Sequence, residues 1–369
     1  MKLNKKMIII LCSVIAAILV LIVIIMLLLG GRSKKLSYNK IEEKIVTAGM
    51  NYYKNHQDQL PEVGTVSIDT STLVAQGYLS DLTTYTGEDE ICNGTLYVTK
   101  NPSNYSYRAK LYCGTNYVTK TFKERVVTDV VTSGSGLYAE EQVNPNADDA
   151  SMHKVYVFKG YNVNNYIKVG SYYWRIVKIY ENGEMAVLGD PELLRTIWDN
   201  RYNIEEDKYT GINSYAVSRL SDTINTKVVG DVDGFLKIKS LITPHTACIG
   251  NRDTNDASKD GSSECSETLE NQYFSLLPAY DYLNASLDSN CIAALDESCY
   301  NYNYLASERD EWWTITGVGD NTYEVYFVDG VMEADNASYT KSVRLYAHLD
   351  ANVTYVSGTG TYADPYILK

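Results

Sequence analysis

The sequence lacks the short motifs by which several enzyme classes are recognised. Its 369 residues contain no G-x-S-x-G turn, no H-E-x-x-H helix and no G-x-x-x-x-G-K-[ST] phosphate loop. There is no C-x-x-C pair, and the four histidines are scattered along the chain, which disfavours a zinc site. Because no nucleophile with a partner base can be named, the sequence favours a protein that is not an enzyme.

Basic residues are scarce beyond the first 40 positions. The chain carries 33 Lys and Arg against 46 Asp and Glu, a net charge of −13, and the first 40 residues hold seven of the basic residues and no acid. The rest of the chain therefore has a net charge of −20. A body this acidic repels phosphate backbones, so nucleic acid is excluded as a partner.

A stretch of 23 largely apolar residues without a charge extends from Met7 to Leu29. A helix of this length extends about 34 Å, enough to cross the hydrocarbon core of a bilayer. The run is too long for the apolar part of a signal peptide, and no A-x-A-like cleavage site follows it. Residues 1–35 are therefore predicted to be a cytoplasmic tail and an uncleaved transmembrane anchor, so the membrane is a predicted partner.

Six cysteines follow the anchor, at three short spacings. An even number in close pairs is typical of disulfides in an oxidising compartment, so the body is predicted to be extracellular and the N-terminus cytoplasmic. Local pairing is expected because short loops cost the least chain entropy to close. The predicted bonds are Cys92–Cys113, Cys248–Cys265 and Cys291–Cys299.

Residues 36–125 have the pattern of a small α+β domain. A helix is predicted to begin near Ser37, and a second, shorter helix follows Asp69. Two alternating segments, 95–100 and 105–113, flank a turn with Pro102 and predict a β-hairpin in which Cys92 and Cys113 face each other. The apolar stripe of the first helix consists of Ile41, Ile45, Ala48 and Tyr52.

Residues 126–154 are rich in Gly, Ser and Asn and are predicted to be a linker to a larger domain at 155–369. In that domain a hairpin is expected at 172–180 and 184–189, with helices at 213–229 and 278–287. The remaining strands are predicted at 312–316, 322–328, 331–333 and 342–349. This arrangement predicts the α+β class with mostly antiparallel strands.

Ordered segments carry two resemblances. The anchor, AGMNYYKNH and VAQGYLSDL resemble the pilin-like modules of bacterial surface proteins, although no prepilin cleavage motif precedes the apolar run. WRIV, DYLNAS, WWTIT, SVRL and GTGTYADPYIL resemble an uncharacterised C-terminal domain of Gram-positive surface proteins. That family is distantly similar to the C-type-lectin and formylglycine-generating-enzyme folds. The resemblance implies a pilin-like spacer and a C-type-lectin-like domain, with Gly317 and Leu345 where the family usually has proline.

One acidic segment has the spacing of a calcium loop, which would make calcium the only cofactor. Its candidate ligands are Asp256, Ser258, Asp260 and Glu267, with Gly261 at the sixth position. Ser263 stands where such loops have an apolar residue, and Cys265 is expected to be tied in a disulfide. An ordinary solvated loop is therefore the alternative interpretation.

Aromatic residues suggest a carbohydrate-binding surface. Trp312 and Trp313 could stack on sugar rings, with Asp320 and Asn321 in a nearby loop. The alternative is that these tryptophans belong to the core of the sheet.

The predicted function is a membrane-anchored extracellular binding or adhesion protein, whose partner is a glycan or a surface protein that the sequence does not identify. The alternatives are a structural, pilin-like subunit of a surface appendage and an exported enzyme.

Overall fold

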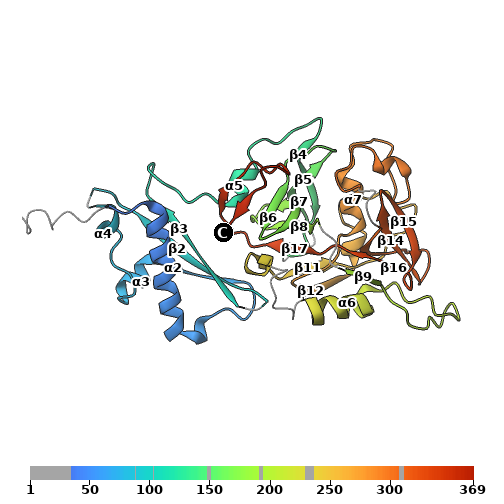
Figure 1. Ribbon diagram of the computed structural model, residues 1–369, viewed down its shortest axis with the longest axis horizontal. Helices are drawn as coiled ribbons and strands as arrows, with labels where there is room; N and C mark the ends of the chain where they lie inside the picture. Colours follow the sequence, from blue (N-terminus) through green and yellow to red (C-terminus); the bar gives the residue numbers. More distant parts are fainter. Residues whose placement is uncertain are drawn as a thin grey trace, which may run out of the picture. The chain divides into compact units, whose positions relative to one another are not determined.

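The computed structural model describes residues 35–369, except for residues 88, 103, 148–150, 191–193, 229–236 and 307–310 (Figure 1). The chain divides into two compact units. The smaller contains the described residues up to 56 together with 68–96 and 109–118, and the larger contains 57–67, 97–108 and 119–369. No helix in the described ranges is long and apolar enough to cross a membrane, and the predicted anchor at 7–29 lies outside those ranges.

The smaller unit is built on helix α2 (Tyr38–Asn55). All four residues of its predicted apolar stripe are buried, which confirms the predicted face of the helix. At Gly49 a Cβ atom would lie only 1.9 Å from Cδ2 of Leu96, so glycine lets the helix approach the sheet closely. Two short helices, α3 (Thr70–Ala75) and α4 (Thr83–Thr86), complete the helical part.

A three-stranded sheet has the order β1 (Thr65–Asp69), β2 (Asn93–Lys100), β3 (Tyr105–Tyr112). Strands β2 and β3 confirm the predicted hairpin. The division between the units runs through it, because residues 97–108 cluster with the larger unit. The predicted boundary at residue 125 is therefore not where the structure divides.

Two large sheets organise the larger unit. In spatial order, the first contains β10 (Ile242–Thr243), β17 (Tyr346–Leu349), β8 (Met185–Gly189), β7 (Tyr172–Tyr180), β5 (Met152–Lys159) and β4 (Gly136–Val143), with β6 (Tyr166–Val169) paired to β7. The second contains β15 (Val331–Asn336), β14 (Glu324–Asp329), β13 (Trp312–Gly317), β16 (Thr340–Val343) and β9 (Leu194–Ile197).

Two small two-stranded sheets and several short helices complete this unit. The sheets pair β11 (His245–Cys248) with β12 (Thr268–Gln272), and β18 (Tyr355–Ser357) with β19 (Ile367–Leu368). The α-helices are α5 (Phe122–Val126), α6 (Arg219–Thr223) and α7 (Ala279–Ala285). The unit is α+β with mostly antiparallel sheets, which confirms the predicted class.

The predicted linker at 126–154 is wrong in its central part. Strand β4 pairs with β5 over its whole length, from Gly136 opposite Lys159 to Val143 opposite Met152. Phe122 and Val126, on either side of the predicted boundary, are both buried in the core of the larger unit. The polar composition reflects an edge strand with an exposed face, not a flexible joint.

The predicted hairpin of β7 and β8 is confirmed, and Gly183 in its turn has a φ of 99°. The predicted helix at 213–229 is instead broken into a 3₁₀ turn at Tyr215–Val217, helix α6 and a π-helical turn at Ile224–Val228. Its cap is Ser218, whose Oγ accepts a hydrogen bond from the Ser221 amide.

The single strand predicted at 342–349 is two strands in different sheets. Strand β16 pairs with β9 and β13 in the second sheet, and β17 pairs with β8 and β10 in the first. The chain passes from one sheet to the other at Arg344 and Leu345, both of which are buried. A continuous buried run cannot reveal such a change of sheet, because both strands have the same apolar pattern.

Candidate functional site

All three predicted disulfides are formed: Cys92–Cys113, Cys248–Cys265 and Cys291–Cys299. Their Cα atoms are 4.2–4.5 Å apart. Each bond closes a local loop, as the chain-entropy argument predicts.

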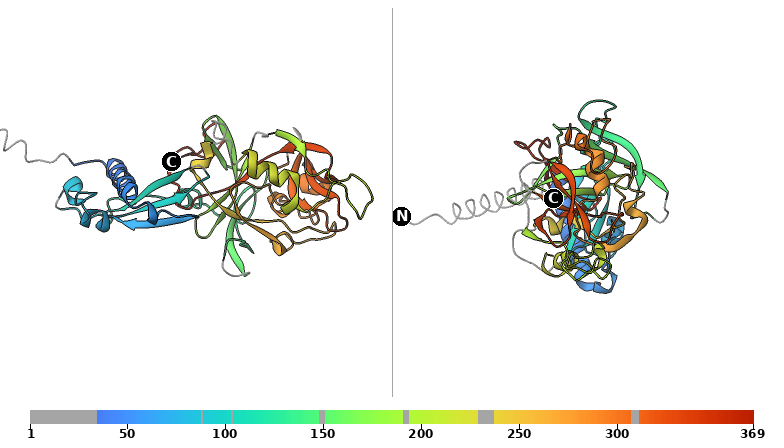
Figure 2. Two further views of the ribbon diagram at one scale, coloured as in Figure 1. Left: turned by 90° about the horizontal axis from the view of Figure 1, so that it is seen from below. Right: turned by 90° about the vertical axis from the view of Figure 1, so that its right-hand side faces the viewer.

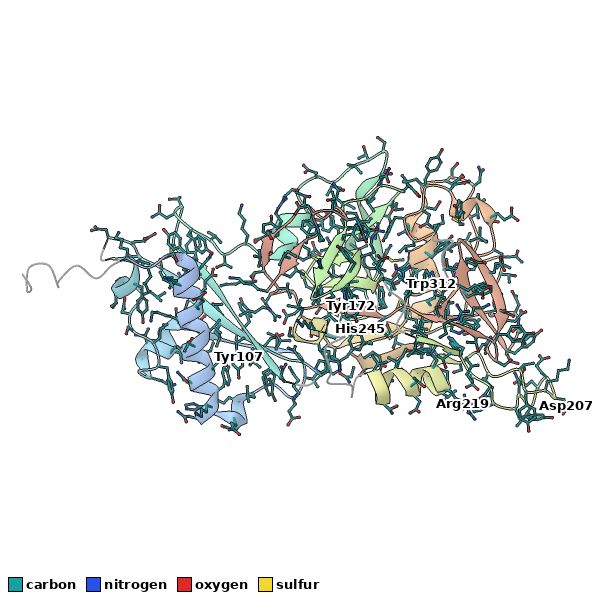
Figure 3. The ribbon with its side chains drawn as sticks, in the orientation of Figure 1. Tyr107, Tyr172, Asp207, Arg219, His245 and Trp312 are labelled. Carbon is teal, nitrogen blue, oxygen red and sulfur yellow. A yellow bond between two sulfur atoms is a disulfide. The ribbon has the colours of Figure 1, made fainter. Side chains whose placement is uncertain are left out.

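The two tryptophans predicted to bind sugar belong to the core. Trp312 is 2% exposed and Trp313 is fully buried. They lie on β13, in the middle of the second sheet, and Trp313 donates from Nε1 to the Thr196 carbonyl at 3.1 Å. Figure 3 labels Trp312 among densely packed side chains. The prediction that these rings form a binding surface is therefore wrong.

Asp320 and Asn321 serve the turn before β14. Asp320 accepts a hydrogen bond from the Thr254 amide at 2.8 Å, and Asn321 accepts from the amides of Tyr323 and Glu324. These contacts show that both residues stabilise the turn. Neither residue lines the tyrosine-lined pocket of the described structure.

The predicted calcium loop is filled by an arginine. The guanidinium of Arg252, which is fully buried, donates to the carbonyls of Asp256 and Ser258 at 3.0 and 2.8 Å and to both carboxylate oxygens of Glu264. Backbone carbonyls and a carboxylate are the ligands that a calcium ion would need. The positive group that organises this loop is therefore a side chain of the protein itself.

The carboxylates of the predicted calcium site also do not converge. Among the described residues, the only group of three metal-binding side chains within 4.8 Å of one another is Glu90 with Cys92 and Cys113, and those cysteines are joined in a disulfide. The Asp260 carboxylate instead accepts a hydrogen bond from the Ser262 amide, and the Glu267 side chain is exposed to solvent. In the described structure Asp256 and Ser258 contact Arg252, and Asp260 and Glu267 do not join them as a ligand set.

The structure brings together one serine and histidine that the sequence does not associate. Ser275 Oγ lies 3.0 Å from His245 Nε2, the spacing of a nucleophile and its base. Both residues are at most 2% exposed, and the adjoining cavity has a volume of only about 10 Å³, room for about one water molecule. His245 Nδ1 has no partner in the described structure, so the orienting third group of a triad is missing.

The residues around this pair form a closed polar network. Lys178 Nζ donates to Asp281 Oδ1 at 2.5 Å, to the Tyr280 hydroxyl and to Gln142 Oε1. Tyr346 donates to the other oxygen of Asp281, and the rings of His245 and His348 stack at 4.2 Å. Because every member is buried, this network holds the core together and offers no substrate a path to it.

A pocket on the described surface is lined by exposed aromatic rings. Its volume is about 540 Å³, within the range of small-ligand sites. Tyr161 and Tyr302 are 66% and 65% exposed, and Tyr300 is 38% exposed. We call it the tyrosine groove; it is lined by Ser135, Tyr161, Asn162, Tyr300, Asn301, Tyr302, Asn303 and Ala306.

Segments distant in sequence meet to build the groove. In Figure 1 helix α7 runs beside the first sheet. The segment that follows it contributes residues 300–303 and Ala306 to one wall of the groove. The opposite wall follows β5, where Gly160 forms a bridge with Asn303 and donates its amide to the Ala285 carbonyl. A Cβ at Gly160 would lie 2.2 Å from Ser135 Oγ, so glycine is required for this close approach.

The wall after α7 is rigid. The Cys291–Cys299 disulfide closes the loop before Tyr300. Asn303, fully buried, donates to the carbonyls of Tyr282 and Cys299 at 3.0 and 2.9 Å, and its own Oδ1 accepts from the Leu305 amide. These bonds hold the groove in one shape before any ligand arrives.

Tyr302 has a left-handed backbone with a φ of 50°, which costs a tyrosine about 1–3 kcal/mol and persists only when its surroundings impose it. Here the Tyr302 carbonyl accepts from the Leu287 amide, and the conformation leaves the ring exposed in the groove.

Among the described residues that line the tyrosine groove, none has a charged side chain. Aromatic faces and amide groups together suit a ligand with flat apolar faces and many hydroxyl groups. The sequence contains the residues as YN at 161–162 and YNYN at 300–303, a local concentration of Tyr and Asn. The sequence alone does not associate the two segments, because they are about 140 positions apart and only the tertiary structure joins them.

Another exposed feature is the loop between β9 and the turn at Tyr215. Figures 1 and 2 both show it leaving the body of the larger unit, and Asp207 lies near its end in Figure 3.

Comparison of the chain with models of known protein families, with characterised proteins and with solved structures finds no match.

Proposed function

We propose that the protein is a membrane-anchored extracellular binding protein, and that its larger unit binds an uncharged carbohydrate in the tyrosine groove. The observation that carries the proposal is the set of exposed tyrosines held on a rigid frame beside asparagine side chains. Pyranose rings have apolar C–H faces that pack on aromatic rings, and their hydroxyl groups bond to amides. A C-type-lectin-like fold for this unit and a pilin-like character for the smaller one remain part of this proposal.

The predicted anchor at 7–29 and the three disulfides support an extracellular location. The uncharged lining formed by the described residues supports a neutral ligand, because groups such as phosphates would gain no ion pair with those residues. An exported enzyme is disfavoured, since the Ser275–His245 pair is closed to substrates.

The test is an array of neutral and charged glycans probed with the full-length protein in detergent. We expect binding to a neutral oligosaccharide and its loss in Tyr161→Ser and in Tyr302→Asn, where asparagine accepts the left-handed backbone but removes the ring. Tyr339→Ser is the matched control, because Tyr339 is 54% exposed outside the groove. Binding that survives both groove substitutions, or that is seen only for proteins, would overturn the proposal.

A further inference from the structure

Two buried arginines of the larger unit lie close enough to repel each other, and in the described ranges they have only one acidic side chain within ion-pair distance. Arg175 on β7 and Arg344 after β16 are each 8% exposed. Arg175 donates from Nε to Asn165 Oδ1 at 2.6 Å and from Nη1 to the Tyr166 hydroxyl at 2.7 Å. Its guanidinium lies 3.9 Å from the ring centre of Tyr166 and 4.8 Å from that of Tyr304. All of these partners are uncharged.

Arg344 is also weakly paired. Its Nε donates to the Gly189 carbonyl at 2.8 Å, and its guanidinium lies 5.0 Å from the ring centre of Trp312. Its Nη2 is 3.5 Å from Asp190 Oδ1, longer than a good charged hydrogen bond, and the Asp190 side chain is 36% exposed. Across the described residues, Asp190 is the only carboxylate within ion-pair distance of either arginine.

Within the part of the chain that the structure describes, this arrangement leaves one buried positive charge without a counter-charge. Burial lowers the pKa of Arg344 to about 10, Asp190 opposes that shift and Arg175 adds to it by repulsion. Burial likewise lowers the pKa of Arg175. Stacking on aromatic rings offsets part of the cost, but a second negative charge would offset more.

An exposed aromatic surface lies beside the two arginines. The ring of Tyr362, 60% exposed, stacks on Tyr173 at 4.8 Å and meets the ring of Tyr166 edge-on at 5.4 Å. Tyr166 is thus in contact with both Arg175 and Tyr362. A ligand with one anionic group and one flat apolar face fits this combination.

We propose that Arg175 and Arg344 bind the carboxylate or sulfate group of an acidic sugar, whose ring packs on Tyr362. The arginines supply N–H donors in the planar geometry that matches such oxyanions. The Asp190 carboxylate neutralises part of the positive charge of Arg344 and therefore competes with the anionic group of the ligand. This site shares no lining residue with the tyrosine groove, so it is a second site with a different chemistry.

The experiment measures binding of the full-length protein in detergent to three probes: a galacturonic acid oligomer, the same oligomer with its carboxyl groups reduced, and a sulfated disaccharide. Sodium sulfate at matched ionic strength distinguishes a free anion from a sugar-borne one. We expect the acidic sugars to bind, the reduced oligomer to fail, and sulfate alone to bind more weakly than the sulfated sugar.

Three variants sharpen the test. Arg344→Gln should weaken binding of the acidic oligomer by about tenfold or more, because a charged hydrogen-bonding group is lost. Asp190→Asn should strengthen it, because the competing carboxylate is gone, and Arg219→Gln, an exposed arginine on α6, should leave it unchanged.

Equal binding of the acidic and reduced oligomers, no binding of either acidic sugar, or weaker binding in Asp190→Asn would each overturn the proposal. The first two outcomes depend only on the native protein, so they decide the matter even where Arg344→Gln does not fold.

Discussion

The Arg252 guanidinium lies in the loop where the sequence predicts a calcium ion, and it binds the oxygen atoms of that loop. It joins the carbonyls of Asp256 and Ser258 to the carboxylate of Glu264, which is itself fully buried and also accepts from the Tyr280 amide. The spacing predicts a calcium loop, whereas the structure has the Arg252 guanidinium bound to Asp256, Ser258 and Glu264. That the cation is a guanidinium could not be read from a spacing.

We predict that Arg252→Met destabilises the protein by about 3–5 kcal/mol, because it leaves Glu264 as a buried, unpaired carboxylate. Arg219→Met removes an exposed arginine, and its effect should stay within about 0.5 kcal/mol. Urea unfolding of the two variants and the wild type provides the measurement. Similar stability of both variants would contradict the central role of Arg252.

The buried histidines and Glu184 predict opposite responses to pH. Burial lowers the pKa of His348 to about 3 and that of His245 in the same direction. Their neutral forms therefore stabilise the native state above the unfolded pKa of about 6.5, and this contribution is lost as the pH falls below that value. Burial raises the pKa of Glu184 to about 7, so its contribution is present below its unfolded pKa and is lost as the pH rises toward 7.

We predict that Glu184→Gln, compared with the wild type, becomes relatively more stable as the pH rises from about 4 to about 8. The gain should reach at most about 3 kcal/mol, given the shift in the pKa of Glu184. Urea unfolding of both proteins across this range measures the difference. A difference that does not change with pH would show that Glu184 titrates normally.

At the scale of elements, the small disulfide loop after α7 connects stability to the tyrosine groove. The Cys291–Cys299 disulfide joins residues eight positions apart and closes a short loop immediately before residues 300–303, which line the groove. Asn303 ties the end of that loop to the last turn of α7 through the Tyr282 carbonyl. The disulfide therefore restrains the wall on which Tyr300 and Tyr302 are placed.

We predict that replacing Cys291 and Cys299 together by serine lowers stability by about 2–3 kcal/mol, as the entropy of a short closed loop implies. The same variant should also bind the groove ligand more weakly, because the wall is no longer fixed. Ser298→Ala, in the same loop, is the control and should change neither property much. Denaturant unfolding and glycan binding are the two measurements, and unchanged values for both would refute this linkage.

For the whole molecule, the proposed orientation places the body outside the cell. The −20 charge of the chain beyond residue 40 and the three disulfides are both compatible with an exported body. The residues that would cross the membrane are those at 7–29.

We predict that protease added to intact cells degrades the chain beyond residue 36 and leaves an N-terminal fragment protected. The physical reason is that the bilayer shields only the anchor and the short tail before it. Immunoblotting with antibodies to each end measures this, with a cytoplasmic protein as the control for lysis. A fully protected body in cells with a permeable wall would reverse the proposed orientation.

The sequence by itself determined the features that depend on near neighbours along the chain. The α2 stripe, the hairpins and the three disulfides follow from side-chain period, turn residues and short loop closure, which are local quantities. The α+β class follows from the alternation of those elements.

Only the tertiary structure decided which sheet each strand joins and which polar groups meet. Trp312 and Trp313 are buried because β13 has neighbours on both sides, and the predicted linker is a strand because β5 pairs with it. Tyr161 and Tyr302 share a groove because Gly160 bonds beside Asn303. Tyr161 and Tyr302 are more than 100 positions apart in the sequence. The energy of contacts between such distant residues depends on packing and desolvation, which no local sequence pattern encodes.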